Sequence, residues 1–401
     1  MADPCTLPWL TIIGIGEDGL GGLSEASRKA LDRAEAVFGG ERHLALADIG
    51  GRGRRWPVPF DAKEVLARRG RPTAVLASGD PFWHGVGGSL TSRLPAGEWI
   101  AHPAPSTFSL AAARLGWRLE QVACIGLHAA PFERLVPLLA RGARIICLVR
   151  DDKAAADLAA WLTVRGWGTS KCWTLSALGG PRERITESRA NSCAADSAAS
   201  PLAFALEAEG MAGLPRACGL SDDLFKHDGQ ITKRPVRALA LSALAPRPGE
   251  ILWDIGAGSG SISVEWALAG GKGIAVEPRE DRAANIRANA TAFGLEQRIS
   301  VVEGPAPAVL SGLEKPNAVF IGGGLDAATF DAIWKLAPGA SRVVAHAVTL
   351  ETEALLAELQ NRHGGDLMRV EISHAAPLGR RRSWEAGRPI VQWSTMKGDG
   401  E

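Results

Sequence analysis

The chain has 401 residues, of which 46% are hydrophobic and 22% are charged, and its formal net charge is +1. This length suits two globular domains, and the near-zero charge argues against a nucleic-acid partner whose binding depends on the neutralisation of phosphates. Apolar runs fall well short of the roughly 20 residues of a membrane span, and no basic leader opens the chain, so we expect a cytoplasmic protein with no membrane partner. The six cysteines form no CxxC pair. We therefore expect reduced thiols and no metal site.

The first half alternates short apolar runs with amphipathic stretches, which is the pattern of an α/β domain. We expect helices over residues 24–36 and 106–115, and strands over residues 10–15, 73–77, 99–102, 122–125 and 144–149. Small and polar residues from 187 to 200 interrupt the alternation, and residues 202–207 form an expected last strand. Residues 209–229 show no clear period and are interpreted as a linker.

The second half begins again, with an expected helix over residues 233–244. Further helices are expected over residues 261–269 and 281–293, and strands over residues 251–254, 273–276, 299–302, 318–321 and 342–345. Residues 367–374 and 390–394 are expected to pair as a terminal hairpin. This alternation predicts a doubly wound sheet that finishes with antiparallel strands.

The most informative stretch is DIGAGSG, residues 254–260, which follows the first strand of the second half. Glycines at three alternate positions permit positive φ and let backbone amides approach a ligand. At the end of the next strand stands Glu277, whose carboxylate can accept hydrogen bonds from both hydroxyl groups of a ribose. Such positions meet at the carboxyl ends of the strands of an open α/β sheet, so we expect a ligand that contains a nucleoside.

The spacing of the glycines distinguishes two classes of nucleoside cofactor. The dinucleotide fingerprint is GxGxxG, whereas the spacing here is GxGxG and Ser261 takes the place of the last glycine. Asp254 stands just before the loop, where a carboxylate suits a cation better than a pyrophosphate. The pattern favours S-adenosylmethionine, which carries a sulfonium and no phosphate, over NAD. An NAD(P)-dependent oxidoreductase and a purely structural glycine turn are the alternatives.

Three segments of the second half, WDIGAGSGSISVEWA, AVEP and VVEGPAPAVL, resemble the first three blocks of the class I methyltransferases. The resemblance implies that the glycine loop holds the methionine part of S-adenosylmethionine, that Glu277 holds the ribose, and that the third block lies along the adenine. The implied cofactor-binding residues are Thr232, Gly256, Ala257, Gly258, Ser259, Gly260, Glu277, Gly304, Pro305 and Ala306.

The fourth strand of the second half runs into NAVFIGGG, and the chain contains no tyrosine. It therefore lacks the aromatic box with which methyltransferases of exocyclic amines hold their substrates. Three glycines would instead leave room for a bulky, flat substrate near the methyl group, and the arginines of GQITKRPVR and GRRRSWEAGR could bind several carboxylates. The candidate substrate residues are Gly322, Gly323, Gly324, Arg380, Arg381 and Arg382. The alternative interpretations are an ordinary glycine turn and a solvated basic loop.

The first half contains a formal GxGxxG at residues 14–19, but Glu17 and Asp18 occupy the place of a pyrophosphate, so we predict no dinucleotide site there. GIGEDGLGGLSEASRKAL, VLASGDPFWHGVG and HPAPSTFSLAAARLGW resemble three ordered blocks of the tetrapyrrole methylases, the class III methyltransferases, and LGGPRERI fits a later block. In that family a proline usually stands where this chain has Glu17. The resemblance implies a cofactor pocket formed by Gly14, Ser78, Gly79, Asp80, Ser106 and Thr107.

A tetrapyrrole methylase followed by a class I methyltransferase resembles the CobL-type precorrin-6B (precorrin-6Y) C5,15-methyltransferases (decarboxylating) of cobalamin biosynthesis, whose halves also occur as separate CbiE-like and CbiT-like chains. The resemblance implies a two-lobed tetrapyrrole methylase domain over residues 1–209 and a Rossmann-like class I domain over residues 210–401, with one S-adenosylmethionine in each. It also implies methylation of precorrin-6B at carbon 5 by the first domain and at carbon 15 by the second. The acetate on ring C loses carbon dioxide, and the product is precorrin-8.

The implied chemistry asks the protein to align the reacting atoms, to exclude water and to remove a proton. His346 is a candidate base, with a core histidine as the alternative, and Lys233 is a candidate partner for a substrate carboxylate. We expect a homo-oligomer, because class III domains commonly dimerise. An RNA-binding methyltransferase that uses the basic stretches 52–55 and 68–71 is a further alternative.

Overall fold

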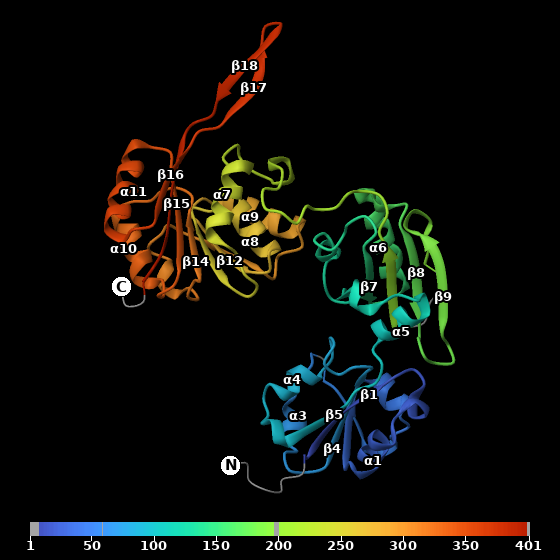
Figure 1. The fold of residues 1–401 in the computed structure, drawn as a ribbon. Helices are drawn as coiled ribbons and strands as arrows, with labels where there is room; N and C mark the ends of the chain where they lie inside the picture. Colours follow the sequence, from blue (N-terminus) through green and yellow to red (C-terminus); the bar gives the residue numbers. More distant parts are fainter. Residues whose placement is uncertain (1–7, 58, 196–199, 399–401) are drawn as a thin grey trace. The chain divides into compact units, whose positions relative to one another are not determined.

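The structure is a computed structural model and describes residues 8–57, 59–195 and 200–398. The chain divides into two compact units (Figure 1). The N-terminal unit comprises Met1–Phe132 and Leu138–Ala212, and the C-terminal unit comprises Glu133–Pro137 and Gly213–Glu401. Within the described residues, no helix combines the length and the apolar character that a membrane span requires. Five cysteines are free thiols, and Cys5 lies outside the described residues.

The first lobe of the N-terminal unit is a parallel five-stranded sheet in the order β3-β2-β4-β1-β5. Successive residues of its central strands enter opposite cores: Ile12 and Val75 pack in one cluster, and Ile13 and Leu76 in the other. Burial on both faces explains the continuous apolar runs of these strands. The elements are β1 (Leu10–Ile15), α1 (Glu25–Arg33), β2 (Ala36–Gly39), α2 (Glu41–Leu46), β3 (Gly53–Arg55), α3 (Lys63–Leu66), β4 (Thr73–Ser78), α4 (Gly87–Thr91) and β5 (Trp99–His102).

The second lobe is a five-stranded mixed sheet in the order β6-β7-β10-β8-β9, in which β6 and β7 are parallel and the other neighbours are antiparallel. Helix α5 packs on it, and Phe108 and Ala111 are buried against Ile146 and Ala203. The elements are α5 (Thr107–Leu115), β6 (Val122–Gly126), β7 (Arg144–Val149), α6 (Asp152–Leu162), β8 (Lys171–Ser176), β9 (Arg184–Arg189) and β10 (Leu202–Glu207).

The C-terminal unit is built on a seven-stranded sheet in the order β13-β12-β11-β14-β15-β19-β16. The sheet is parallel from β13 to β15, and β19 and β16 complete it in antiparallel pairing, so the predicted doubly wound sheet with an antiparallel end is confirmed. The strands are β11 (Ile251–Ile255), β12 (Lys272–Glu277), β13 (Ile299–Glu303), β14 (Ala318–Ile321), β15 (Arg342–Ala347), β16 (Asp366–Val370) and β19 (Ile390–Met396).

Helices cover both faces of this sheet (Figure 1). Trp253 faces the core formed with α10 and α11, whereas Leu252 faces the core formed with α7 and α8. Alternate residues of β11 therefore hold the two layers of helices in place. The helices are α7 (Arg234–Leu244), α8 (Ser261–Leu268), α9 (Glu280–Ala292), α10 (Ala327–Leu336) and α11 (Leu350–His363).

Three features of the fold differ from the expectations. The helix expected over 24–36 ends at Arg33, because Ala36 already begins the buried strand β2. The polar interruption was expected from residue 187, but strand β9 continues to Arg189 and pairs with β8. The expected linker 209–229 is partly packed, because Leu220 and Phe225 enter the core of the C-terminal unit with Val264 and Ile286.

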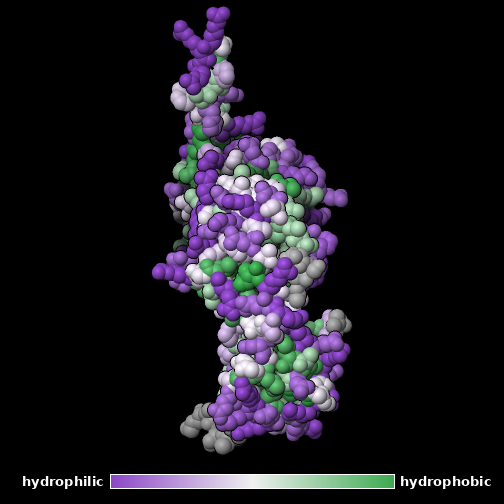
Figure 2. Space-filling model, turned by 90° about the vertical axis from the view of Figure 1, so that its right-hand side faces the viewer, coloured by the Kyte–Doolittle hydropathy of each residue, from purple (hydrophilic) through white to green (hydrophobic). Residues whose placement is uncertain are grey.

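The end of the chain is more elaborate than the single hairpin that was expected. Strands β16 and β19 do pair, but β16 ends at Val370, and a separate hairpin of β17 (Ser373–Leu378) and β18 (Arg381–Ala386) follows. This hairpin projects away from the sheet of the C-terminal unit (Figure 1), and its far end is hydrophilic (Figure 2). Leu378 and Trp384 on it are 67% and 73% exposed.

Candidate active sites

The glycine loop of the C-terminal unit connects β11 to α8. Gly256, Gly258 and Gly260 have φ values of 67°, 59° and 71°, a left-handed conformation that side chains rarely adopt. A Cβ atom on Gly260 would also lie 2.8 Å from Ile286 Cγ2. The backbone of the loop therefore requires glycine. The loop is also tied to the next strand, because the amides of Gly256 and Ala257 donate to the Val276 carbonyl.

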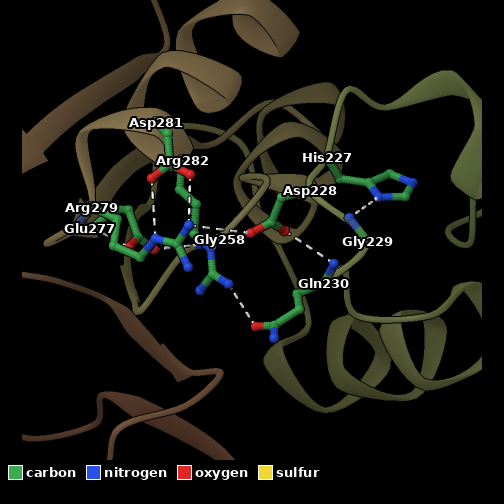
Figure 3. Close-up of polar contacts among 9 residues, drawn as sticks. All are labelled: His227, Asp228, Gly229, Gln230, Gly258, Glu277, Arg279, Asp281 and Arg282. Carbon is green, nitrogen blue, oxygen red and sulfur yellow. Dashed lines mark hydrogen bonds and ion pairs between the residues drawn. The ribbon is translucent and has the colours of Figure 1, made fainter.

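Glu277 lies at the end of β12 and faces this loop. Its side chain is 2% exposed. One carboxylate oxygen accepts a hydrogen bond of 2.8 Å from the Gly258 amide, and the other accepts one of 3.1 Å from the Arg279 amide (Figure 3). Gly304, after β13, donates its amide to the Glu277 carbonyl. The first, second and third blocks of the class I pattern thus meet at one residue, Glu277: the first at its carboxylate and the third at its backbone carbonyl.

The glycine loop and Glu277 open onto a cavity of about 660 Å³. The predicted site residues that line it are Thr232, Lys233, Gly256, Ala257, Gly258, Ser259, Glu277, Gly322, Gly323, Gly324 and His346. The cavity wall also includes Arg388, from the stretch GRRRSWEAGR.

The remaining predicted residues of the C-terminal unit do not line this cavity. Gly260 ends the loop against Ile286, and Gly304, Pro305 and Ala306 follow directly after β13. Arg380, Arg381 and Arg382 belong to the exposed β17–β18 hairpin. Sequence proximity to Arg388 suggested a common role, but the hairpin carries these three arginines away from the sheet (Figure 1).

Asp254 does not face the cavity, contrary to the interpretation that it accompanies a cation. It is 1% exposed, and its Oδ2 accepts hydrogen bonds from the amide and hydroxyl of Ser263, at 3.1 and 2.7 Å. Burial raises the pKa of Asp254 to about 6. Its role is to hold the first turn of α8 against β11.

His346, on strand β15, lines the cavity. It is 6% exposed, its Nε2 lies 2.9 Å from Gln392 Oε1, and its ring stands edge-on to Phe320 at 5.0 Å between centroids. Burial lowers the pKa of His346, so the imidazole is neutral near pH 7. Lys233, the N-cap residue of α7, is exposed and lies 4.0 Å from Asp222.

A polar network beside the cavity was not anticipated from the sequence (Figure 3). Arg282, on α9, donates to Asp228 Oδ2 at 2.9 Å and to Gln230 Oε1 at 2.6 Å. Asp228 also accepts from the Gln230 amide at 3.0 Å, and the hydrogen bond from Arg282 lowers the pKa of the Asp228 carboxyl. The network fixes the segment that carries Gln230 into the cavity wall.

A buried arginine fixes the next part of the same segment. Arg237, on α7, is 0% exposed and donates to Glu265 at 2.6 Å and to Asp222 at 3.0 Å. It also donates to the carbonyls of Thr232 and Leu220. The spacing of these residues in the sequence gave no indication of this cluster.

The N-terminal unit contains a cavity of about 480 Å³, whose wall includes Ser78, Ser106 and Thr107. Gly79 lines a smaller neighbouring cleft with Ser78 and Thr107. Two predicted residues line neither. Gly14 allows the close approach of strand and loop, since a Cβ there would lie 1.8 Å from the Gly79 carbonyl oxygen, and Asp80 accepts from the Phe82 amide at 2.9 Å.

Glu17, which replaces the usual proline of the tetrapyrrole methylases, is 6% exposed. It forms ion pairs with Arg42 from the first lobe and, at 3.1 Å, with Arg182 from the second. A buried carboxylate needs such partners. The two guanidinium groups neutralise the Glu17 carboxylate, which explains why this position can hold an acidic residue.

Three arginines of the basic stretches 52–55 and 68–71 have structural partners. Arg52 donates to the carbonyls of Leu31 and Ala34, and Arg68 and Arg69 pair with glutamates of their own lobe. These contacts give the arginines structural partners.

Comparison with known proteins supports both halves of the chain. A family model described as tetrapyrrole (corrin/porphyrin) methylases matches residues 9–194, and one described as a precorrin methyltransferase domain matches residues 223–397. A protein of Sinorhizobium sp named precorrin-6Y C(5,15)-methyltransferase [decarboxylating] is 46% identical over 98% of this chain and 97% of its own length. A protein of the same name from Mycobacterium tuberculosis (strain CDC 1551 / Oshkosh) is 40% identical over 97% of this chain and 100% of its own.

A solved structure is also similar to part of the chain. The crystal structure of the C-terminal domain of precorrin-6Y C5,15-methyltransferase from Rhodobacter capsulatus is 54% identical, covers 46% of this chain and 100% of that chain, and gives a TM-score of 0.45. The full-length similarity to the curated relatives is decisive. The chain belongs to the precorrin-6Y C5,15-methyltransferase (decarboxylating) family.

Proposed function

We propose that this chain methylates precorrin-6B (precorrin-6Y) at carbons 5 and 15 and releases the carboxyl group of the ring C acetate as carbon dioxide, giving precorrin-8. The observation that carries the proposal is the similarity to enzymes of this name over nearly the whole length of both chains. An oxidoreductase has no comparable support, because the relatives are methyltransferases over both halves.

Methyltransferases of these families use S-adenosylmethionine, and we propose one site for it in each unit. In the C-terminal unit, Glu277 would hold the ribose and the glycine loop the methionine part, with Gly304, Pro305 and Ala306 toward the adenine. The hydroxyl of Ser259 supports this fit: it is buried in the cavity wall and has no hydrogen-bond partner among the described residues. A buried polar group of this kind suits a polar ligand.

In the N-terminal unit, Ser78, Ser106 and Thr107 would contact the cofactor in the 480 Å³ cavity. Gly14, Gly79 and Asp80 would act by shaping the loops around it. We assign carbon 5 to this unit and carbon 15, together with assistance to decarboxylation, to the C-terminal unit. When bound, S-adenosylmethionine supplies a methyl group on a positively charged sulfur.

The substrate side of the C-terminal cavity would be the glycine turn after β14. Gly322, Gly323 and Gly324 leave space for a flat macrocycle, and Lys233 and Arg388 present cations to its carboxylates. With Gln392 Oε1 accepting from His346 Nε2, Nδ1 of the neutral imidazole would be available to take a proton from carbon 15.

The test is the reaction of the full chain with precorrin-6B and S-adenosylmethionine labelled in its methyl group. We expect two labelled methyl groups, located by NMR at carbons 5 and 15, and the loss of one carbon dioxide by mass spectrometry. A product with neither label would refute the proposed activity. Gel filtration of the same sample tests the proposed homo-oligomer, and fractionation of cells that express the chain tests the proposed cytoplasmic location.

A further inference from the structure

Methylation of carbon 5, which we assign to the N-terminal unit, requires the removal of one proton, and the present inference rests on that assignment. A carbon–carbon bond forms with an electron pair of the macrocycle, and the methyl–sulfur bond breaks with its electron pair going to sulfur. Carbon 5 then holds both the methyl group and its original hydrogen. Loss of this hydrogen as a proton returns the electron pair to the macrocycle, so the site needs a proton acceptor.

The wall of the 480 Å³ cavity offers few acceptors. Over its described residues it contains no aspartate or glutamate, and its ionisable side chains are His43, His84, His128 and Arg150. A guanidinium does not accept a proton in proteins. The imidazoles are therefore the described side chains of this wall that can take up a proton near neutral pH.

His43 is poorly suited to this task. Its Nε2 lies 2.8 Å from Arg42 Nη2 and 2.8 Å from Ser78 Oγ. Because the guanidinium can only donate, His43 Nε2 must accept, and its lone pair is already engaged. Burial and the charge of Arg42 lower the pKa of His43 to about 4.

His84 and His128 both lie close to Gly126, at the end of β6. A Cβ atom placed on Gly126 would lie 3.5 Å from His84 Nδ1 and 3.4 and 3.6 Å from His128 Cε1 and Nδ1. Both imidazoles thus border a residue that has no side chain, on the wall of the same cavity. His84 also has a φ of 56°, an uncommon value for a residue other than glycine, and such conformations cluster at functional sites.

We propose that His84 and His128 form the proton acceptor for carbon-5 methylation: a ring nitrogen of this pair takes the proton while the electron pair returns to the macrocycle. A ring nitrogen of either residue would carry the proton away from carbon 5. The other ionisable groups nearby are His43 and Arg150 on the wall, Asp80 on the loop of His84, and Asp151, which pairs with Arg150 at 2.8 Å.

The test uses the full chain and the substitutions His84→Asn and His128→Asn, separately and together. Asparagine tolerates the left-handed backbone of residue 84 better than most residues, so the fold should be retained. We expect each single variant to lower kcat for carbon-5 methylation by about 100-fold, with the KM for S-adenosylmethionine unchanged. Carbon-15 methylation by the same molecules is the internal control, and His102→Asn, at the end of β5 and outside the cavity wall, is the matched histidine control.

Two readouts separate a base from a structural residue. Substrate deuterated at carbon 5 should show a primary isotope effect in the variants, because proton removal becomes limiting, and the acid limb of the pH–rate profile for carbon 5 should disappear in the double variant. Carbon-5 methylation within threefold of wild type in the double variant would overturn the inference, as would a loss that appears only as a raised KM. Wild-type chain that methylates carbon 15 but never carbon 5 would instead refute the underlying assignment.

Discussion

Replacing Arg237 by methionine tests how the wall of the C-terminal cavity is held. The change removes a fully buried guanidinium that donates to Glu265, to Asp222 and to the carbonyls of Thr232 and Leu220. Removing one partner of a buried ion pair costs about 3–5 kcal/mol. Glu265 keeps two amide donors, from residues 219 and 220, so we expect the lower end, about 3 kcal/mol.

The assay is thermal unfolding together with steady-state kinetics. For a unit of this size, about 3 kcal/mol corresponds to a decrease of roughly 6–12 °C in the Tm of the C-terminal transition. Thr232 lines the cavity, and its carbonyl is one of the groups that Arg237 holds. We therefore expect the KM for S-adenosylmethionine in carbon-15 methylation to rise about tenfold, which is about 1.4 kcal/mol, while carbon-5 methylation is unchanged.

The matched control is Arg342→Met. Arg342 is also buried, donates to the Leu244 carbonyl at 2.6 Å and pairs with Glu250, but it begins β15 and therefore lies at the opposite end of the sheet from the cavity. We expect a similar loss of Tm without a change in KM. If Arg237→Met raises the KM no more than Arg342→Met does, the positioning role of Arg237 is refuted.

Three further predictions follow from the C-terminal unit. Glu277→Ala should raise the KM for S-adenosylmethionine in carbon-15 methylation by at least tenfold and spare carbon 5; unchanged kinetics at carbon 15 would contradict the ribose contact. Asp254 has a raised pKa of about 6, so its unfolded form ionises first as pH rises from about 4 to 6, and the unit should lose about 3 kcal/mol of stability over that range; melting curves of Asp254→Asn should lack this decline. Arg388→Ala should raise the KM for the precorrin about tenfold, whereas Arg381→Ala should leave it unchanged.

Much of the fold could be predicted because its central strands are buried on both faces. Continuous apolar runs marked β1, β4, β7, β11 and β14 to within two residues of their observed bounds. Four strands of the N-terminal unit were missed. The strands β2 and β3 have only four and three residues, β9 reads RITESR and is largely exposed, and β8 reads KCWTLS without a clear alternation of apolar and polar residues.

The candidate site was predictable only where local backbone chemistry determines it. The glycines of the loop and Glu277, the last residue of β12, form a recognisable sequence pattern. In the structure, the Gly258 amide donates a hydrogen bond to Glu277. The contact between Arg282 and Asp228 spans 54 residues, and no local pattern encodes it. The arginines near residue 380 share a stretch with Arg388, but a hairpin separates them in space.

The β17–β18 hairpin leaves the sheet after Val370 and returns to it at Ile390, and the strands on either side pair directly with each other. The hydrogen bonds between β16 and β19 therefore continue up to the base of the β17–β18 hairpin, which we call the arm. Changes in the length or charge of the arm can occur without shifting the strands that carry His346 and Gln392, so what the arm contacts and what the cavity binds can vary independently.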